Sequence, residues 1–138
     1  MKNWVIVLLI FIMPLSLYAY FEAKAQNEKM CKIEGNSNIK DYSAKIIKFY
    51  SPMCSECKDT NIEMQKAMKD YKKSVIVQEI NVIEQNKKGP DCNKEAIKKY
   101  KVTLVPTLVF LNKDGELIKK YEGLMKSEEI IEVLDGIK

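Results

Sequence analysis

Cys54 and Cys57 are separated by two residues, Ser55 and Glu56, where a short apolar segment runs into a helical pattern. Cysteines at this spacing can close a disulfide or bind a metal, and a position between a strand and a helix favours redox chemistry. The free N–H groups and positive dipole end at a helix N-terminus stabilise a thiolate over a thiol. In such motifs the pKa of the reactive thiol falls from about 8.5 to roughly 3.5 to 7.5. We therefore expect Cys54 to be the catalytic nucleophile and Cys57 to resolve the mixed disulfide.

Two elements must position this cysteine pair. Residues 46–50 are too short and too rich in β-branched and aromatic side chains for a helix, which predicts a buried strand that ends before Pro52. From Lys58 to about Lys73, apolar residues recur at helical spacing, with charged residues between them and no glycine or proline. A strand followed by one amphipathic helix is therefore predicted around the pair.

The rest of the chain alternates strand-like and helix-like patterns. Residues 112–115 form a predicted hairpin turn, in which Gly115 supplies a positive φ. The predicted order is strand, helix, strand, helix, strand, strand, helix, which indicates an α/β domain. The later elements are a strand over 74–82, a helix over 94–100 capped by Asp91 or Asn93, strands over 107–111 and 116–121, and a last helix capped by Ser127.

The composition excludes several classes of function. All 23 basic residues are lysine, so bidentate arginine clamps on phosphate are absent, and we expect no nucleic-acid partner. The chain contains no histidine, which removes Cys-His nucleophile pairs and histidine-ligated metal sites. We therefore predict chemistry that needs no metal and no cofactor.

The first 25 residues indicate export. Lys2 precedes an uncharged and mostly apolar run, Trp4 to Phe21, and Ala23-Lys24-Ala25 has the small-x-small pattern of a signal-peptidase site. The run is also close to the roughly 18 residues that a membrane helix needs. A cleaved signal peptide and an uncleaved membrane anchor are both open, and membrane contact is expected only through this segment if it is uncleaved. Either way we predict an extracytoplasmic protein, which is periplasmic, secreted or anchored facing outside.

The chain is accordingly divided into three parts. Residues 1–25 are the signal peptide or anchor, residues 26–43 an N-terminal extension with a short edge strand, and residues 44–138 the main domain.

The element order, the cysteine pair after the first firm strand, Val105-Pro106-Thr107 before the third, and Tyr121-Glu122-Gly123 after the fourth together resemble the thioredoxin family. The resemblance covers about residues 44–138. It implies an α/β thioredoxin fold, in which a central mixed sheet is flanked by helices. It also implies that Pro106 is a cis proline beside the cysteines, and that Val105, Pro106 and Thr107 bind the substrate backbone.

The chain also departs from that family. Lys48 stands where thioredoxins keep a buried acid beneath the second cysteine, and Met53 where many relatives carry tryptophan. Lys48 is therefore a candidate for tuning the cysteine pKa. Either it snorkels to the surface, or its positive charge stays beneath the pair and favours the Cys57 thiolate.

Cys31 and Cys92 are the other two cysteines. In an exported chain an even cysteine count is first interpreted as disulfides, so a structural Cys31–Cys92 bridge is a candidate. Two alternatives stay open: Cys92 as a third redox thiol near Cys54, and a zinc site of all four cysteines, although the spacing is not that of a zinc ribbon.

Two hypotheses of function follow. The first is an extracytoplasmic thiol-disulfide oxidoreductase whose partners are protein substrates with disulfides or thiols and a redox protein that resets the pair. The direction of transfer is left unassigned. The second is a non-catalytic thioredoxin-like binding or chaperone module in which Cys54 and Cys57 stay as a fixed disulfide.

Overall fold

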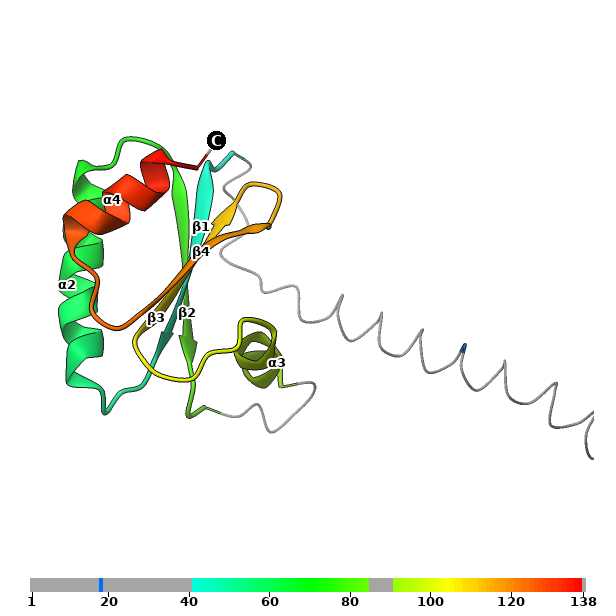
Figure 1. The fold of residues 1–138 in the computed structure, drawn as a ribbon. Helices are drawn as coiled ribbons and strands as arrows, with labels where there is room; N and C mark the ends of the chain where they lie inside the picture. The colour runs from blue at the N-terminus through cyan, green and yellow to red at the C-terminus, as the bar shows by residue number, and fades with distance from the viewer. Residues whose placement is uncertain (1–17, 19–40, 85–90, 138) are drawn as a thin grey trace, which may run out of the picture. The chain divides into compact units, whose positions relative to one another are not determined.

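The computed structural model describes residues 18, 41–84 and 91–137 (Figure 1). The chain divides into two compact units, Met1–Ile33 and Glu34–Lys138, and Tyr18 is the described residue of the first unit. The predicted signal or anchor segment, apart from Tyr18, and residues 26–40 of the predicted extension lie outside the described residues. Within the described part, no helix has the length and hydropathy needed to cross a membrane.

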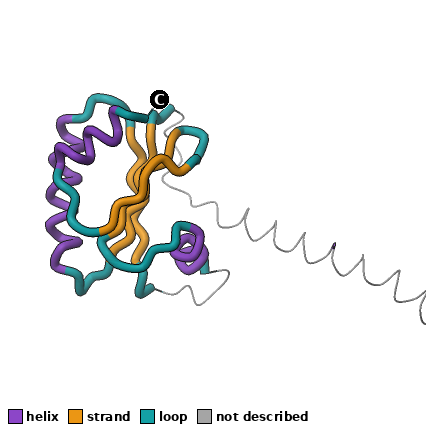
Figure 2. The backbone as a smooth tube through the Cα atoms, viewed as in Figure 1, coloured by secondary structure: helices purple, strands orange, loops and turns teal. Residues whose placement is uncertain are grey.

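Four strands form one mixed sheet (Figure 2). They lie in the order β2-β1-β3-β4, so that β1 and β3 are central. β1 runs parallel to β2 and antiparallel to β3, and β3 pairs antiparallel with β4. The strands are β1 (Ala44–Tyr50), β2 (Val75–Asn81), β3 (Thr107–Asn112) and β4 (Leu117–Glu122).

Three helices flank this sheet. They are α2 (Ser55–Asp70), α3 (Cys92–Lys99) and α4 (Ser127–Asp135). Figure 1 shows α2 and α4 together on one side of the sheet and α3 on the other. The predicted element order and the predicted class, an α/β fold with a central mixed sheet flanked by helices, are both confirmed.

Helix ends differ from the predicted positions. α2 starts at Ser55 instead of Lys58, because Cys54 is its N-cap, and α2 stops at Asp70. The predicted cap Ser127 is the first residue of α4 rather than its N-cap, which is Lys126. Asp91 is confirmed as the cap of α3, where its side chain accepts a hydrogen bond from the Lys94 N–H at 3.1 Å.

The main core lies between the sheet and the α2–α4 layer. Strand alternation directs every second residue of β1 and β3 to this face. Its buried members include Ile46, Leu108 and Phe110 from the sheet, Met64 and Ala67 from α2, and Ile130 and Leu134 from α4. On the opposite face, Phe49 meets Tyr100, which follows α3, edge to face with ring centroids 6.1 Å apart. Side chains therefore cover both faces of the central strands near the end of β1, just before the segment that carries Cys54 and Cys57.

Glu63 joins α2 to the start of α4. Its Oε2 accepts a hydrogen bond from the Ser127 N–H at 3.0 Å, and its Oε1 accepts one from Lys66 Nζ at 2.8 Å. The Lys66 ammonium and, next, the Ser127 N–H hold the pKa of the Glu63 carboxyl at about 2, below its ordinary value. The carboxylate therefore satisfies a free N–H group at a helix N-terminus, where negative charge is favourable.

Glu63→Gln is expected to lower the free energy of unfolding at neutral pH and to change its pH dependence. Because the pKa is depressed in the folded state, the ionised carboxylate contributes stability above its unfolded pKa of about 4.3, and this contribution is lost as pH falls toward 2. Urea unfolding between pH 2 and 7 should show a wild-type advantage that grows up to about pH 5 and then levels off. Glu132→Gln, at an exposed position of α4, is the control, and an equal effect in both variants would contradict this assignment.

Candidate functional site

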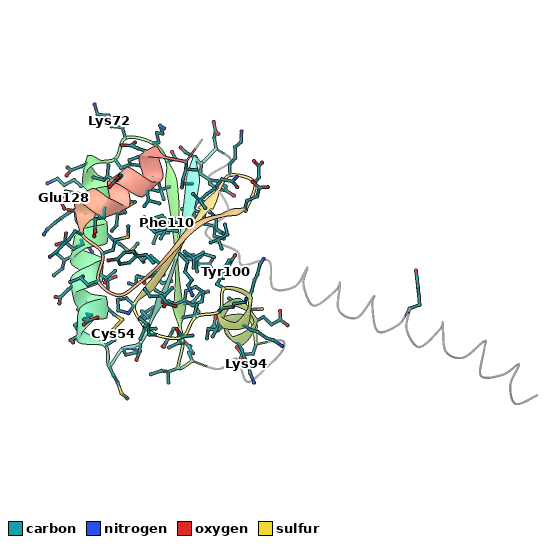
Figure 3. The ribbon with its side chains drawn as sticks, viewed as in Figure 1. Cys54, Lys72, Lys94, Tyr100, Phe110 and Glu128 are labelled. Carbon is teal, nitrogen blue, oxygen red and sulfur yellow. A yellow bond between two sulfur atoms is a disulfide. The ribbon has the colours of Figure 1, made fainter. Side chains whose placement is uncertain are left out.

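Cys54 and Cys57 form a disulfide at the N-terminus of α2, with their Cα atoms 5.3 Å apart (Figure 3). β1 ends at Tyr50, and Ser51 to Met53 turn the chain into the helix, where the Cys54 N–H donates to the Ser51 carbonyl oxygen at 3.1 Å. The rigid strand and helix therefore fix both sulfur atoms at one end of the sheet.

The two sulfur atoms have different surroundings. Cys54 is partly exposed, whereas Cys57 is 3% exposed. Cys54 is the N-cap residue of α2, and its Sγ accepts a hydrogen bond from the Cys57 N–H at 3.1 Å. An N–H group and a helix dipole that both point at this sulfur favour its anionic form once the disulfide is reduced. The geometry thus makes Cys54 the accessible sulfur of the pair.

Alkylation of the reduced protein at acidic pH is expected to label Cys54 before Cys57. Thiolates react with iodoacetamide and thiols do not, and Cys54 combines exposure with the helix N-terminus. Mass spectrometry of peptides after short exposure measures both rates. Equal labelling rates for the two cysteines would contradict the prediction that Cys54 is the more reactive one.

The segment from Leu104 to Thr107 lies beside the disulfide. Cys54 Sγ is 3.7 Å from the Val105 carbonyl oxygen, a van der Waals contact in the disulfide state because the sulfur then carries no proton. The Val105–Pro106 peptide bond is cis. The Thr107 hydroxyl donates to the Leu104 carbonyl oxygen at 2.7 Å, and the Gly123 N–H donates to the Pro106 carbonyl oxygen at 2.8 Å. The structure therefore places Val105 in contact with Cys54, and Pro106 and Thr107 follow it directly in the chain.

Two exposed apolar side chains flank this arrangement. Met53 is 88% exposed immediately before Cys54, and Leu104 is 47% exposed immediately before Val105. Leu104 was not among the predicted site residues. Its position directly before the Val-Pro-Thr segment was the available signal.

Lys48 is buried on the α2 face of the sheet, with 1% of the residue exposed. Its ammonium donates to Asn61 Oδ1 of α2 and forms an ion pair with Glu79 Oε1 of β2 at 2.5 Å. The ammonium also lies 5.0 Å from the centre of the Tyr50 ring. Of the two alternatives for Lys48, snorkelling into solvent does not occur. No local sequence pattern points to Asn61 or Glu79 as partners of Lys48.

Cys92, the first residue of α3, is not a free thiol. Cys31 lies outside the described residues, so the Cys31–Cys92 bridge stays a prediction. Because no described cysteine is free, Cys92 does not stand in this structure as a third free redox thiol.

Peptide mapping of the non-reduced protein is expected to recover a linked peptide that contains Cys31 and Cys92. The expectation depends on the even cysteine count of an exported chain. Two separately alkylated peptides at these positions would contradict the predicted Cys31–Cys92 bridge.

Comparisons with known proteins agree with this geometry. A family model described as a thioredoxin-like domain matches residues 36–138. Thioredoxin from Staphylococcus epidermidis is 30% identical over 91 residues, which cover 66% of this chain and 79% of that protein. Protein disulfide-isomerase from Hordeum vulgare is 27% identical over 92 residues, 64% of this chain and 17% of that protein. The chain therefore matches less than a fifth of the length of this relative.

Solved structures show the same fold. A thioredoxin-2 described as a component of malaria parasite protein secretion machinery superposes with a TM-score of 0.58 at 18% identity, covering 70% of this chain and 84% of that one. An exposed lipoprotein thioredoxin from Streptococcus pneumoniae superposes with a TM-score of 0.55 at 20% identity, covering 68% and 84%. Because the family model matches most of the chain, residues 36–138, the chain belongs to the thioredoxin-like family.

Proposed function

We propose that the protein is a thiol-disulfide oxidoreductase that exchanges disulfides with protein substrates through Cys54 and Cys57. The observation that carries the proposal is the disulfide at the N-terminus of α2, where a partly exposed Cys54 is bonded to a buried Cys57. Relatives named thioredoxin and protein disulfide-isomerase support the same activity.

The reaction proceeds in two exchange steps. In the reducing direction, the Cys54 thiolate attacks one sulfur of a substrate disulfide, which forms a Cys54–substrate bond and releases one substrate thiolate. The Cys57 sulfur then loses its proton and attacks Cys54 Sγ, which forms the Cys54–Cys57 disulfide and releases the second substrate thiolate. The substrate gains the two electrons that the cysteine pair loses. The oxidising direction is the same sequence in reverse, and a redox partner protein returns the pair to its starting state.

The substrate is proposed to bind along Val105, Pro106 and Thr107. Val105 and Pro106 lead directly into β3, which begins at Thr107, and the Val105 carbonyl oxygen touches Cys54 Sγ, so a chain held there brings its own sulfur to Cys54. The exposed side chains of Met53, next to Cys54 in the chain, and Leu104, next to Val105, add apolar contact area. An extended, partly apolar segment of an unfolded protein fits this surface.

The protein is further proposed to act outside the cytoplasm. The uncharged run from Trp4 to Phe21 behind Lys2 supports export, as does a solved relative named an exposed lipoprotein thioredoxin. A disulfide exchange protein has protein substrates in such compartments, because disulfides persist there.

Insulin reduction and refolding of scrambled ribonuclease test the activity. Wild-type protein should accelerate at least one of these reactions, and Cys54→Ser should reduce the rate to the uncatalysed background. A wild-type rate equal to background in both assays would instead support the alternative, a binding module with a fixed disulfide.

A further inference from the structure

Glu79 forms an ion pair across the sheet with Lys48. The two residues are partners in the parallel register of β1 and β2, so their side chains leave the same face. The Glu79 carboxylate is half exposed, at 50%, whereas the lysine is 1% exposed. The pair therefore joins a charge at the surface to a charge inside the protein.

The ammonium of this pair is hydrogen-bonded to α2, the helix that carries Cys57. It donates to Asn61, which is four residues after Cys57 in α2 and therefore one turn along the same helix face. Side chains at this spacing have Cβ atoms about 5 to 6 Å apart. The Tyr50 ring on β1 also lies near the ammonium, and the register partner of Lys48 on β3 is the uncharged Leu108. Because Cys57 and Lys48 are both buried, bulk water and salt screen the field between them only weakly.

We propose that Glu79 sets the reduction potential of the Cys54–Cys57 pair by balancing the charge of Lys48, an inference that rests on the proposed function. Reduction of the disulfide takes up two electrons, and the product keeps a negative charge wherever a thiolate remains. The Lys48 charge favours that product and makes the disulfide more oxidising. The Glu79 carboxylate opposes it, and Glu79 acts as a positioning residue because it touches Lys48 rather than the sulfur atoms.

Glu79→Gln removes the negative charge of this side chain and leaves its shape nearly unchanged. The glutamine keeps an oxygen that can accept from Lys48, and Asn61 still holds the ammonium beside α2, so the change removes one negative charge. The equilibrium of the pair with glutathione should shift toward the dithiol by about threefold to tenfold, which is about 14 to 30 mV. Lys48→Met should shift the same equilibrium in the opposite direction. The double variant removes both charges and is expected to return to within about threefold of wild type.

Two further variants complete the experiment. Glu79→Asp keeps the charge and should retain the wild-type potential, and Glu116→Gln removes a carboxylate at the far end of β3, where its partner is Asn112, and should change nothing. Shifts in opposite directions for the two single variants support charge balance. Shifts in the same direction, as loss of a structural contact would produce, or no shift in Glu79→Gln, would overturn it.

The wild-type titration separates this inference from the proposed function. If the wild-type pair does not equilibrate with glutathione, the proposed function fails and the role of Glu79 fails with it. If the wild-type pair titrates and the variants coincide with it, the role of Glu79 alone is lost.

Discussion

Cys57→Ser is expected to turn the protein from a catalyst into a trap for its substrates. Cys54 remains partly exposed at the N-terminus of α2 and can still attack a substrate disulfide. The serine hydroxyl does not act as a thiolate, so it cannot displace the substrate from Cys54. Turnover of insulin should fall by on the order of 100-fold or more, because the two cysteines act as one unit.

Trapped adducts give the direct measurement. After incubation with scrambled ribonuclease, Cys57→Ser should run on a non-reducing gel as a one-to-one adduct that dithiothreitol removes. Cys54→Ser is the matched control and should form little adduct, because its remaining sulfur is buried at 3% exposure. Adducts that accumulate on Cys57 in the control variant would reverse the assigned roles.

Lys48→Met is expected to make the Cys54–Cys57 disulfide less oxidising. Methionine keeps an apolar stem of similar length but removes the charge, and it leaves the half-exposed Glu79 carboxylate behind. The lysine charge favours a thiolate in the pair, and the neighbouring carboxylate offsets part of this effect. We expect the pKa of the affected thiol to rise by about one unit in Lys48→Met, which is about 1.4 kcal/mol.

Thiolate absorbance against pH measures this change, and the reduction potential should fall by about 30 mV. Lys45→Met is the matched control, because Lys45 lies on the same strand but three residues away, on the opposite face. Burial, with a smaller contribution from the nearby Lys99 charge, lowers the pKa of Lys45, so the control also removes a partly desolvated lysine. Coincident curves for wild type and Lys48→Met would mean that Lys48 has no part in the chemistry.

The order of elements could be predicted because each one carries its own periodicity. The β-branched and aromatic residues of β1 and the helical spacing of Met64, Ala67 and Met68 in α2 are local signals. The first turn of α2 carried no such signal, since Ser55 and Glu56 are polar and exposed. Its start depends instead on a hydrogen bond to the Cys54 sulfur, which residue patterns do not indicate.

The candidate site was predictable only where its residues are neighbours in the sequence or carry a recognised pattern. Cys54 and Cys57 lie within one turn of helix, so their spacing alone suggests redox chemistry. Val105 was found through the family resemblance, because it is distant from Cys54 in the sequence and approaches it from the segment just before β3. Glu79 was missed, because its partnership with Lys48 depends on the register between β1 and β2.

A redox titration of wild-type protein shows whether Cys54 and Cys57 are an exchange pair or a fixed structural disulfide. The protein is equilibrated in glutathione and dithiothreitol buffers of graded potential, and the Cys54 and Cys57 thiols are trapped with a mass-tagged alkylating reagent. We predict one two-electron transition of this pair at a midpoint between about −270 and −120 mV, the range of disulfide exchange proteins. A pair that stays oxidised below about −300 mV, as structural disulfides do, would contradict it.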